Sequence, residues 1–224
     1  MITANSIAMG AALLAGYLLG SISNAVWVSR MHGVDILTAG SGNPGATNVK
    51  RVLGSKPGNL VFFLDLLKGF IATVWPFIPA IHNGWSIAAQ PQWMALAGLT
   101  GALLGHSFSV FIGFRGGKGV ATTMGGLLAI MPAVVLMAVG AWIIVFYAFR
   151  YVSLASLAFA VCLPLITLLV WQLGWALPRP MGALETGIAV GIFILITIRH
   201  ISNIRRLLNG TESRFVRKST STPV

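Results

Sequence analysis

Residues 120–149 read VATTMGGLLAIMPAVVLMAVGAWIIVFYAF, and this uncharged stretch decides the fold class. Its second part, 133–149, is apolar and approaches the length of a membrane-spanning helix, about 20 residues. Its first part, 120–131, is shorter, at roughly 18 Å of helix against about 30 Å of hydrocarbon. Pro132 separates the two, because proline disfavours the helical conformation for the residue before it. We therefore expect a spanning helix that follows a short one.

Similar apolar runs recur along the 224 residues, which are 56% hydrophobic and only 8% charged. The candidate transmembrane helices number seven, one of them short: 6–28, 59–81, 93–113, 120–131, 133–149, 153–176 and 184–199. Repeated runs and a mean hydropathy of +0.86 indicate an all-α, polytopic integral membrane protein rather than a soluble one. We expect one transmembrane domain over residues 1–210 and a basic cytoplasmic tail over 211–224.

The cations set the expected orientation. The net charge of +11 would point to nucleic acid in a soluble protein, but here the lysines and arginines lie in loops and in the tail. They gather in the segment 30–68, at 115–118, at Arg150 and from Arg199 onward, whereas the segment 82–92 has no charge. The positive-inside rule then puts the N-terminus outside and the C-terminus in the cytoplasm. That orientation requires an odd number of crossings. Seven crossings satisfy it, and five would satisfy it if two of the shorter runs merged or dipped back into the membrane.

The first polar run, Gly40 to Arg51, reads GSGNPGATNVKR between apolar segments. Irregular backbone at membrane depth is tolerated only where protein covers it or water reaches it. Closely spaced glycines let successive N–H groups converge on one oxyanion, and the hydroxyls of Ser41 and Thr47 with the charge of Arg51 complete a phosphate shell. The alternative is a turn-rich connection, which explains the glycines but not so many donors together.

The second polar run, Arg115 to Thr123, reads RGGKGVATT and directly precedes the short apolar helix. Its amides would lie at a helix N-terminus, where the macrodipole favours an anion. The spacing is not that of a Walker A loop, because Gly119 follows Lys118. The alternative, a basic cytoplasmic turn, accounts for Arg115 and Lys118 but not for the three glycines.

Other polar residues lie at the edges of the apolar runs. Asp65 and Lys68 are three residues apart on one helical face, so they form an ion pair or contribute to a site. His106 is expected to donate a hydrogen bond between helices.

A third group of polar residues lies closer to the C-terminus. Ser153 opens a helix after Arg150, as an N-cap or as a phosphate donor. His200 and Asn203 are three residues apart on one face, at the end of the last apolar run. On the expected topology these residues and both glycine-rich runs face the cytoplasm.

The residues that are missing narrow the chemistry. The four carboxylates do not cluster with histidines, so neither a metal nor another cofactor is expected. Cys162 lies in an apolar run, no G-x-S-x-G motif is present, and His106 has no aspartate five residues later. An activated substrate would suit a site without a strong protein nucleophile.

The motifs together resemble a known family. GSGNPGATNVKR, GHSFSVFIGFRGGKGVATT, RYVSLAS and HISNIRRLLNGTE, in this order, are similar to the motifs of the bacterial acyl-phosphate:glycerol-3-phosphate acyltransferases, the PlsY family. The resemblance implies transfer of a fatty acyl group from acyl phosphate to the 1-hydroxyl of glycerol 3-phosphate. The products would be lysophosphatidic acid and phosphate, formed at the cytoplasmic face of the bacterial inner membrane as the first step of phospholipid synthesis.

The resemblance also implies residue roles. The residues matched to catalysis are Ser41, Arg51, His200 and Asn203. The residues matched to substrate binding are Gly42, Asn43, Thr47, Asn48, Gly116, Gly117, Lys118, Gly119 and Ser153. Glu212 would be structural.

The mechanism that we expect from these matches is mainly positioning, because preorganised donors and cations would offset the repulsion between two phosphates. The proton of the attacking hydroxyl would go to a substrate phosphate oxygen or to His200. A transporter for organic anions is the main rival, although the polar motifs gather at one membrane face rather than at the midplane. A scaffold that binds anionic lipid would explain the basic tail alone.

Overall fold

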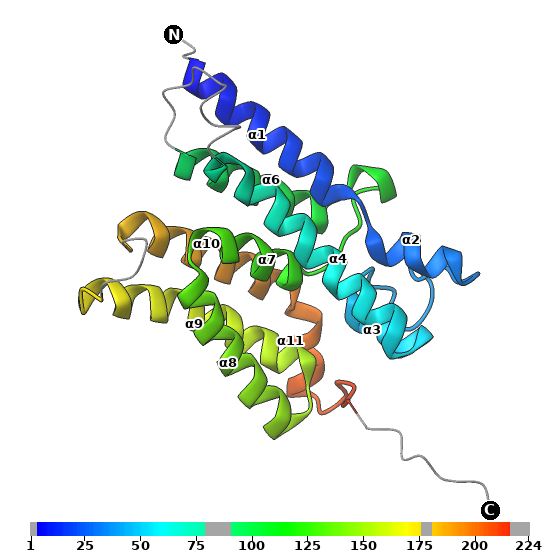
Figure 1. Cartoon of the computed structure of the whole chain (residues 1–224). Helices are drawn as coiled ribbons and strands as arrows, with labels where there is room; N and C mark the ends of the chain where they lie inside the picture. The colour runs from blue at the N-terminus through cyan, green and yellow to red at the C-terminus, as the bar shows by residue number, and fades with distance from the viewer. Residues whose placement is uncertain (1–3, 79–90, 176–180, 216–224) are drawn as a thin grey trace, which may run out of the picture. The chain divides into compact units, whose positions relative to one another are not determined.

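A computed structural model describes residues 4–78, 91–175 and 181–215, and the regular structure within these ranges is helical throughout (Figure 1). The chain divides into two compact units, Met1–Val135 and Leu136–Val224. We describe each unit by itself.

The first unit is built around α6 (Pro91–Ser107), which packs against α1 (Ala4–Ser21), α4 (Ser55–Val74) and α7 (Val120–Ile130). In turn, α4 contacts α7, and it also contacts the two short helices that precede α4 in the chain. The remaining elements of this unit are α2 (Asn24–Met31), α3 (Ala46–Leu53) and the 3-10 turns η1 (Trp75–Phe77) and η2 (Val110–Ile112).

Glycines let the helices of the first unit approach closely. A Cβ added at Gly16 or Gly20 of α1 would collide with the backbone of α6, and one added at Gly101 or Gly105 of α6 would collide with the backbone of α1. Figure 1 shows α1 lying along α6. Small residues at such contacts are typical of helix pairs in membranes, where backbone packing replaces the hydrophobic effect between helices.

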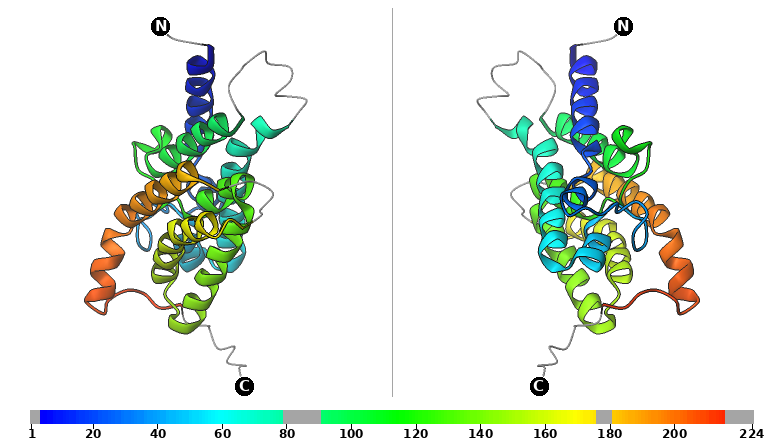
Figure 2. Two further views of the ribbon diagram at one scale, coloured as in Figure 1. Left: turned by 90° about the vertical axis from the view of Figure 1, so that its left-hand side faces the viewer. Right: turned by 90° about the vertical axis from the view of Figure 1, so that its right-hand side faces the viewer.

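The second unit contains most of α8 (Pro132–Phe149), together with α9 (Val152–Gln172), α10 (Ala183–Arg199) and α11 (Ile201–Leu208). α10 packs against α9, and α11 also contacts α9. The chain bends by 61° between α10 and α11, at His200 (Figure 2).

The apolar helices confirm the membrane class. Among the described residues, five spans are long and apolar enough to cross a membrane, and there are six if the bent pair of α10 and α11 is counted as one span. They are Ser6–Met31, Ser55–Phe77, Pro91–Ile112, Pro132–Phe149 and Val152–Gln172, with the pair Ala183–Arg199 and Ile201–Leu208. α7 is short, as expected, with 11 residues, or about 17 Å of helix. The count of seven crossings and the orientation of the termini stay predictions.

Some details of the expected helices were wrong. The run expected over 6–28 is one span with an interruption at Ile22 and Ser23, between α1 and α2. The first polar run is half helical, because α3 begins at Ala46. Neither α3 nor α11 was predicted, since both are short and carry charges on one face. The ends expected at 79–81 and at 176 lie outside the described residues.

Candidate active site

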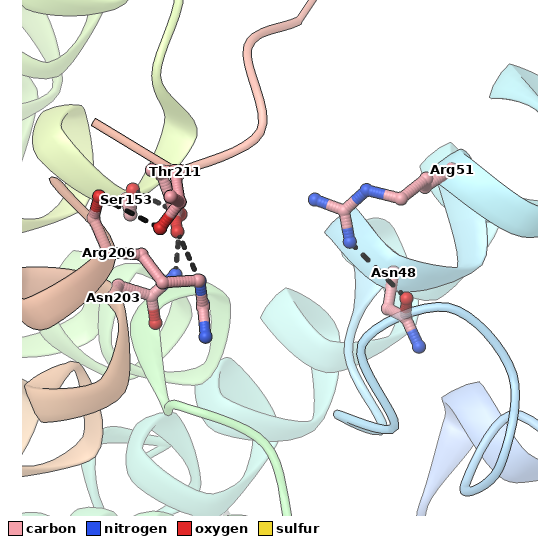
Figure 3. Close-up of polar contacts among 7 residues, drawn as sticks. Asn48, Arg51, Ser153, Asn203, Arg206 and Thr211 are labelled. Carbon is pink, nitrogen blue, oxygen red and sulfur yellow. Dashed lines mark hydrogen bonds and ion pairs between the residues drawn. The ribbon is translucent and has the colours of Figure 1, made fainter. Parts of the chain in front are cut away.

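Asn48 organises the first polar run. Its side chain is buried, and its Oδ1 accepts a hydrogen bond from the backbone N–H of Ser41 at 2.9 Å. The same oxygen lies 3.4 Å from Nη1 of Arg51 (Figure 3). Its Nδ2 donates to the carbonyl oxygens of Ala39 at 3.0 Å and Ile36 at 3.4 Å. One amide thus holds both residues that the motif match assigns to catalysis in this run.

The expected nest of backbone amides is not formed by the glycine loop. The N–H of Ser41 donates to Asn48, that of Gly42 to Ala39, and that of Gly45 to Asn43. These amides close the turn instead of converging on a ligand. The groups that this run presents outward are the exposed residues Ser41 and Arg51. Asn43 and Thr47 are half-buried beside them.

The second glycine-rich run lies against the end of α6. The N–H of Gly117 donates to the carbonyl oxygen of His106 at 2.9 Å. A Cβ at Gly117 would collide with the His106 ring, and one at Gly116 would collide with the backbone there. Gly119 has a φ of +80° and is the N-cap of α7. Close packing and this left-handed turn explain the three glycines, and Lys118 lies half-buried between them.

A buried polar cluster lies behind this run. Nζ of Lys68 is 2.9 Å from Oδ1 of Asp65, which confirms the ion pair. Nδ2 of Asn24 donates to the same oxygen at 3.0 Å, and Nδ1 of His106 lies 3.7 Å from it. Lys68 also donates to the carbonyl oxygen of Ile22 at 2.8 Å. The pair therefore connects α4 to the interruption between α1 and α2 and to the end of α6.

In the second unit, the carboxylate of Glu212 collects three side chains. It accepts hydrogen bonds from Oγ of Ser153 at 2.7 Å, from Nδ2 of Asn203 at 2.6 Å and from Nε of Arg206 at 2.7 Å. Figure 3 shows Ser153, Asn203 and Arg206 pointing toward one another. Of the two roles expected for Ser153, N-cap or phosphate donor, the structure contradicts the N-cap, because Tyr151 holds that position and Ser153 is the second residue of α9.

Arg206 was missed in the sequence, although the motif around it was noted. Arg206 is one of several cations in a basic segment, and no sequence pattern distinguishes it from the others. Arg206 lies six residues before Glu212, and the backbone N–H of Glu212 donates to the carbonyl oxygen of Arg206 at 3.2 Å. Because the chain turns back after α11, the Glu212 carboxylate comes within reach of Arg206 and the ion pair forms.

The charge state of Glu212 follows from these contacts. Burial raises the pKa of this carboxyl. The hydrogen bonds from Ser153, Asn203 and Arg206, together with the positive charge of Arg206, lower the pKa by more than burial raises it. The net pKa lies below the ordinary value for glutamate. Glu212 is therefore ionised at neutral pH and orients three donors.

His200 lies at the bend between α10 and α11, and it is 2% exposed. Its Nδ1 lies 2.8 Å from the carbonyl oxygen of Ile196. A carbonyl oxygen only accepts hydrogen bonds, so this contact requires the proton on Nδ1 in the neutral ring. Nε2 is then the acceptor nitrogen.

Metal ligands do not gather in the described part of the chain. Within residues 4–78, 91–175 and 181–215, no group of three or more histidine, cysteine, aspartate and glutamate side chains could hold a metal ion. The polar side chains described above are mainly donors and cations, which suits anionic ligands.

A family model described as "Glycerol-3-phosphate acyltransferase" matches residues 10–210, a range that includes both polar runs, Ser153, His200 and Asn203. The chain belongs to this family. A glycerol-3-phosphate acyltransferase of Aquifex aeolicus is 43% identical over 199 residues, covering 89% of this chain and 95% of its own. One of Shewanella woodyi is 41% identical over 220 residues, covering 98% of each chain.

Two solved structures are also similar. Both are crystal structures of PlsY, an integral membrane glycerol 3-phosphate acyltransferase, and both are 40% identical to this chain. The glycerol 3-phosphate form has a TM-score of 0.77 and covers 93% of this chain and 96% of its own. The lysophosphatidic acid form has a TM-score of 0.74, with coverages of 93% and 95%.

These matches confirm the predicted family and the prediction that the chain is a membrane-embedded acyltransferase of phospholipid synthesis. They favour the enzyme over the transporter. The roles of the individual residues stay predictions.

Proposed function

We propose that this acyltransferase takes its acyl group from acyl phosphate and transfers it to the 1-hydroxyl of glycerol 3-phosphate. The observation that carries the proposal is the match to PlsY structures named for their glycerol 3-phosphate and lysophosphatidic acid forms, an acceptor and a product of such a reaction. The donor follows from the motif resemblance and from the scarcity of nucleophiles in the chain.

The reaction needs no covalent enzyme intermediate. The hydroxyl oxygen of glycerol 3-phosphate attacks the acyl carbonyl carbon, and the bond from that carbon to the phosphate oxygen breaks. The hydroxyl proton goes to a phosphate oxygen of a substrate or to Nε2 of His200. The products are lysophosphatidic acid and inorganic phosphate. Because the anhydride is already activated, the protein's contribution is positioning and charge compensation.

In the first unit, we assign Ser41 and Arg51 to catalysis, where they meet phosphate oxygens as donor and cation. Support comes from their exposure and from the shared bond to Asn48, which restricts both. The rest of the proposed site in this run contacts the substrate or shapes the turn; it consists of Gly42, Asn43, Thr47 and Asn48.

The second glycine-rich run, Gly116 to Gly119 with Lys118, binds glycerol 3-phosphate in this proposal. Its position before α7 supports the assignment, because a helix N-terminus favours an anion and Lys118 adds a cation.

In the second unit, Ser153, His200 and Asn203 complete the proposed set. Glu212 supports the assignment of Ser153 and Asn203, because a carboxylate that accepts from both restricts their rotamers. The hydroxyl proton of Ser153 is engaged with Glu212, so its oxygen offers a substrate an acceptor rather than a donor. Nδ2 of Asn203 donates to the same carboxylate, which fixes the orientation of its amide group.

We further propose a bacterial inner-membrane location with these residues facing the cytoplasm, the N-terminus outside and the C-terminus inside. The basic loops support it through the positive-inside rule. Seven crossings would be the six candidate spans and α7. The single catalytic domain is retained as a proposal and extends at least to Phe215, whose backbone N–H donates to the carbonyl oxygen of Arg150 at 2.8 Å.

The test is an assay of the purified protein with palmitoyl phosphate and labelled glycerol 3-phosphate, without metal or coenzyme A. We expect labelled lysophosphatidic acid and an equal amount of phosphate. Palmitoyl-coenzyme A in place of palmitoyl phosphate is the matched arm, and product in that arm alone would contradict the proposed donor. A His200→Gln variant with unchanged turnover and pH profile would leave the substrate phosphate as the base.

A further inference from the structure

The interruption in the first span leaves backbone groups that the helix does not satisfy. α1 ends at Ser21 and α2 starts at Asn24. Oγ of Ser109 donates to the carbonyl oxygen of Ser21 at 2.6 Å, and Nζ of Lys68 donates to that of Ile22 at 2.8 Å. Both donors are buried. Inside a membrane protein, carbonyl groups freed by a helix break need such partners.

The charges suit a broken helix. The Lys68 ammonium meets the carbonyl end of α1, where the helix dipole favours a cation. Asp65 accepts from Asn24, the first residue of α2, where the dipole favours an anion. Asp65 and Lys68 are 2% and 5% exposed, so the pair is dry and its geometry is restricted by both helix ends.

The same residues also reach the second glycine-rich run. The backbone N–H of Ser109 donates to the carbonyl oxygen of Arg115 at 3.0 Å, and its own carbonyl oxygen accepts from Phe114 at 2.8 Å. Asp65 lies beside His106, whose carbonyl oxygen holds the N–H of Gly117. Two routes thus lead from the interruption in the first span to residues 115–117.

We propose that Asp65, Lys68 and Ser109, the break clamp, are positioning residues that hold the run Gly116–Gly119 in the conformation that binds the phosphate of glycerol 3-phosphate. The inference rests on the proposed function for its assignment of that phosphate to this run. The clamp acts through the run and touches no substrate. Its effect on the reaction is large because misplacement of binding groups by about 1 Å costs on the order of 100-fold in rate.

Two variants test the clamp, each by two measurements. Lys68→Met keeps the side-chain length without the ammonium, and Ser109→Ala removes only the hydroxyl. We expect each to raise the KM for glycerol 3-phosphate about tenfold, with the KM for acyl phosphate within about twofold. In a Cys162→Ala, Thr123→Cys background, the introduced thiol replaces a fully buried side chain at the end of the run, and it should react with maleimide about tenfold faster because the run opens more often.

Lys56→Met and Ser55→Ala are the matched controls, since both residues are exposed on α4. Unchanged thiol reactivity in folded Lys68→Met and Ser109→Ala proteins would overturn the inference. Faster labelling with an unchanged KM for glycerol 3-phosphate would uphold the clamp and overturn the assignment of the phosphate to this run. Lys68→Met leaves the buried Asp65 carboxylate without its cation, so if that variant does not fold, Ser109→Ala decides, because it leaves the Asp65–Lys68 ion pair intact.

Discussion

At the residue scale, a buried asparagine determines the geometry of the first polar run. Asn48 connects Ile36, Ala39, Ser41 and Arg51 through one amide group. An amide can serve both sides of this arrangement because it carries two donors and one acceptor oxygen with two lone pairs. A hydroxyl or a carboxylate at this position would leave part of it unpaired.

Asn48→Leu should therefore affect both function and stability. We expect kcat/KM to fall about 100-fold, because Ser41 and Arg51 lose their common anchor. The unpaired carbonyl oxygens should lower the free energy of unfolding by about 1–3 kcal/mol. Steady-state kinetics and thermal unfolding in detergent measure the two effects. Asn59→Leu is the control, since Asn59 is exposed and accepts only from Lys50 in the contacts described; equal losses in both variants would contradict the role of Asn48.

Arg206 offers a second residue-scale prediction, through the pKa of Glu212. In the wild type this pKa is below its ordinary value, so the carboxylate stabilises the fold above about pH 4.3 and the effect is lost as pH falls through the lower folded pKa. Arg206→Gln removes a hydrogen bond and a positive charge, so the pKa rises. Activity and stability should then be lost at a higher pH on the acid side.

The measurements for Arg206→Gln are the pH profile of kcat and the midpoint of thermal unfolding between pH 4 and pH 7, a range set by that ordinary value. Arg205→Gln is the matched control, because Arg205 is the exposed neighbour on the same helix. If activity and stability fall at the same acidic pH in the two variants, Arg206 does not lower the pKa of Glu212 in the way proposed.

At the element scale, α7 shows why a short helix is stable in this protein. Most of its residues are buried, and it packs against α4 and α6. A helix that is covered by protein has no need to match the hydrocarbon thickness, because neighbouring helices rather than lipid satisfy its surface. The contact with α4 is close at Gly69 and Gly125, where a Cβ would collide with the carbonyl oxygens of Thr122 and Leu66.

Gly125→Ala should separate α7 from α4. We expect it to lower the free energy of unfolding by about 1–3 kcal/mol or more, because a backbone carbonyl cannot turn aside as a side chain can. Gly140→Ala in α8 is the control: nothing lies within 4 Å of its added Cβ, so alanine's helix propensity should leave stability unchanged or slightly higher. Thermal unfolding in one detergent compares the pair, and an unaffected Gly125→Ala protein would argue against the close contact.

At the scale of the whole molecule, whether α7 crosses the membrane decides whether the two termini lie on the same side. The six candidate spans alone would leave both termini on one side of the membrane, and α7 as a seventh crossing puts them on opposite sides. From the basic loops, the positive-inside rule predicts the second arrangement.

The topology is tested by thiol labelling in a Cys162→Ala background. Ser6→Cys should react with an impermeant maleimide in intact cells, whereas Ser213→Cys should react only after the membrane is opened. Both positions are exposed. Ser55→Cys, at the start of α4 beside the basic first run, is the internal reference for the cytoplasmic side. Reaction of both terminal thiols from the same side would contradict seven crossings.

Family and membrane class were predictable because their signals are local. Apolar runs mark spans wherever lipid must be matched, and glycine-rich runs with cations mark places where the backbone leaves the helix. The same rule explains the misses: α3 and α11 are short and amphipathic, so their apolar residues never form a run. The interruption at Ile22 and Ser23 follows Gly20 and Ser21, but it lies inside a continuous apolar run and no proline marks it.

The sequence alone therefore determined an all-helical membrane acyltransferase and the segments that carry its polar groups. Only the tertiary structure decided which partners these groups have. Lys68 and Ile22 are 46 residues apart, and Ser153 and Glu212 are 59 apart. Such pairs form because a buried charge or a freed carbonyl needs a partner wherever the folded chain supplies one, and no local pattern records that choice.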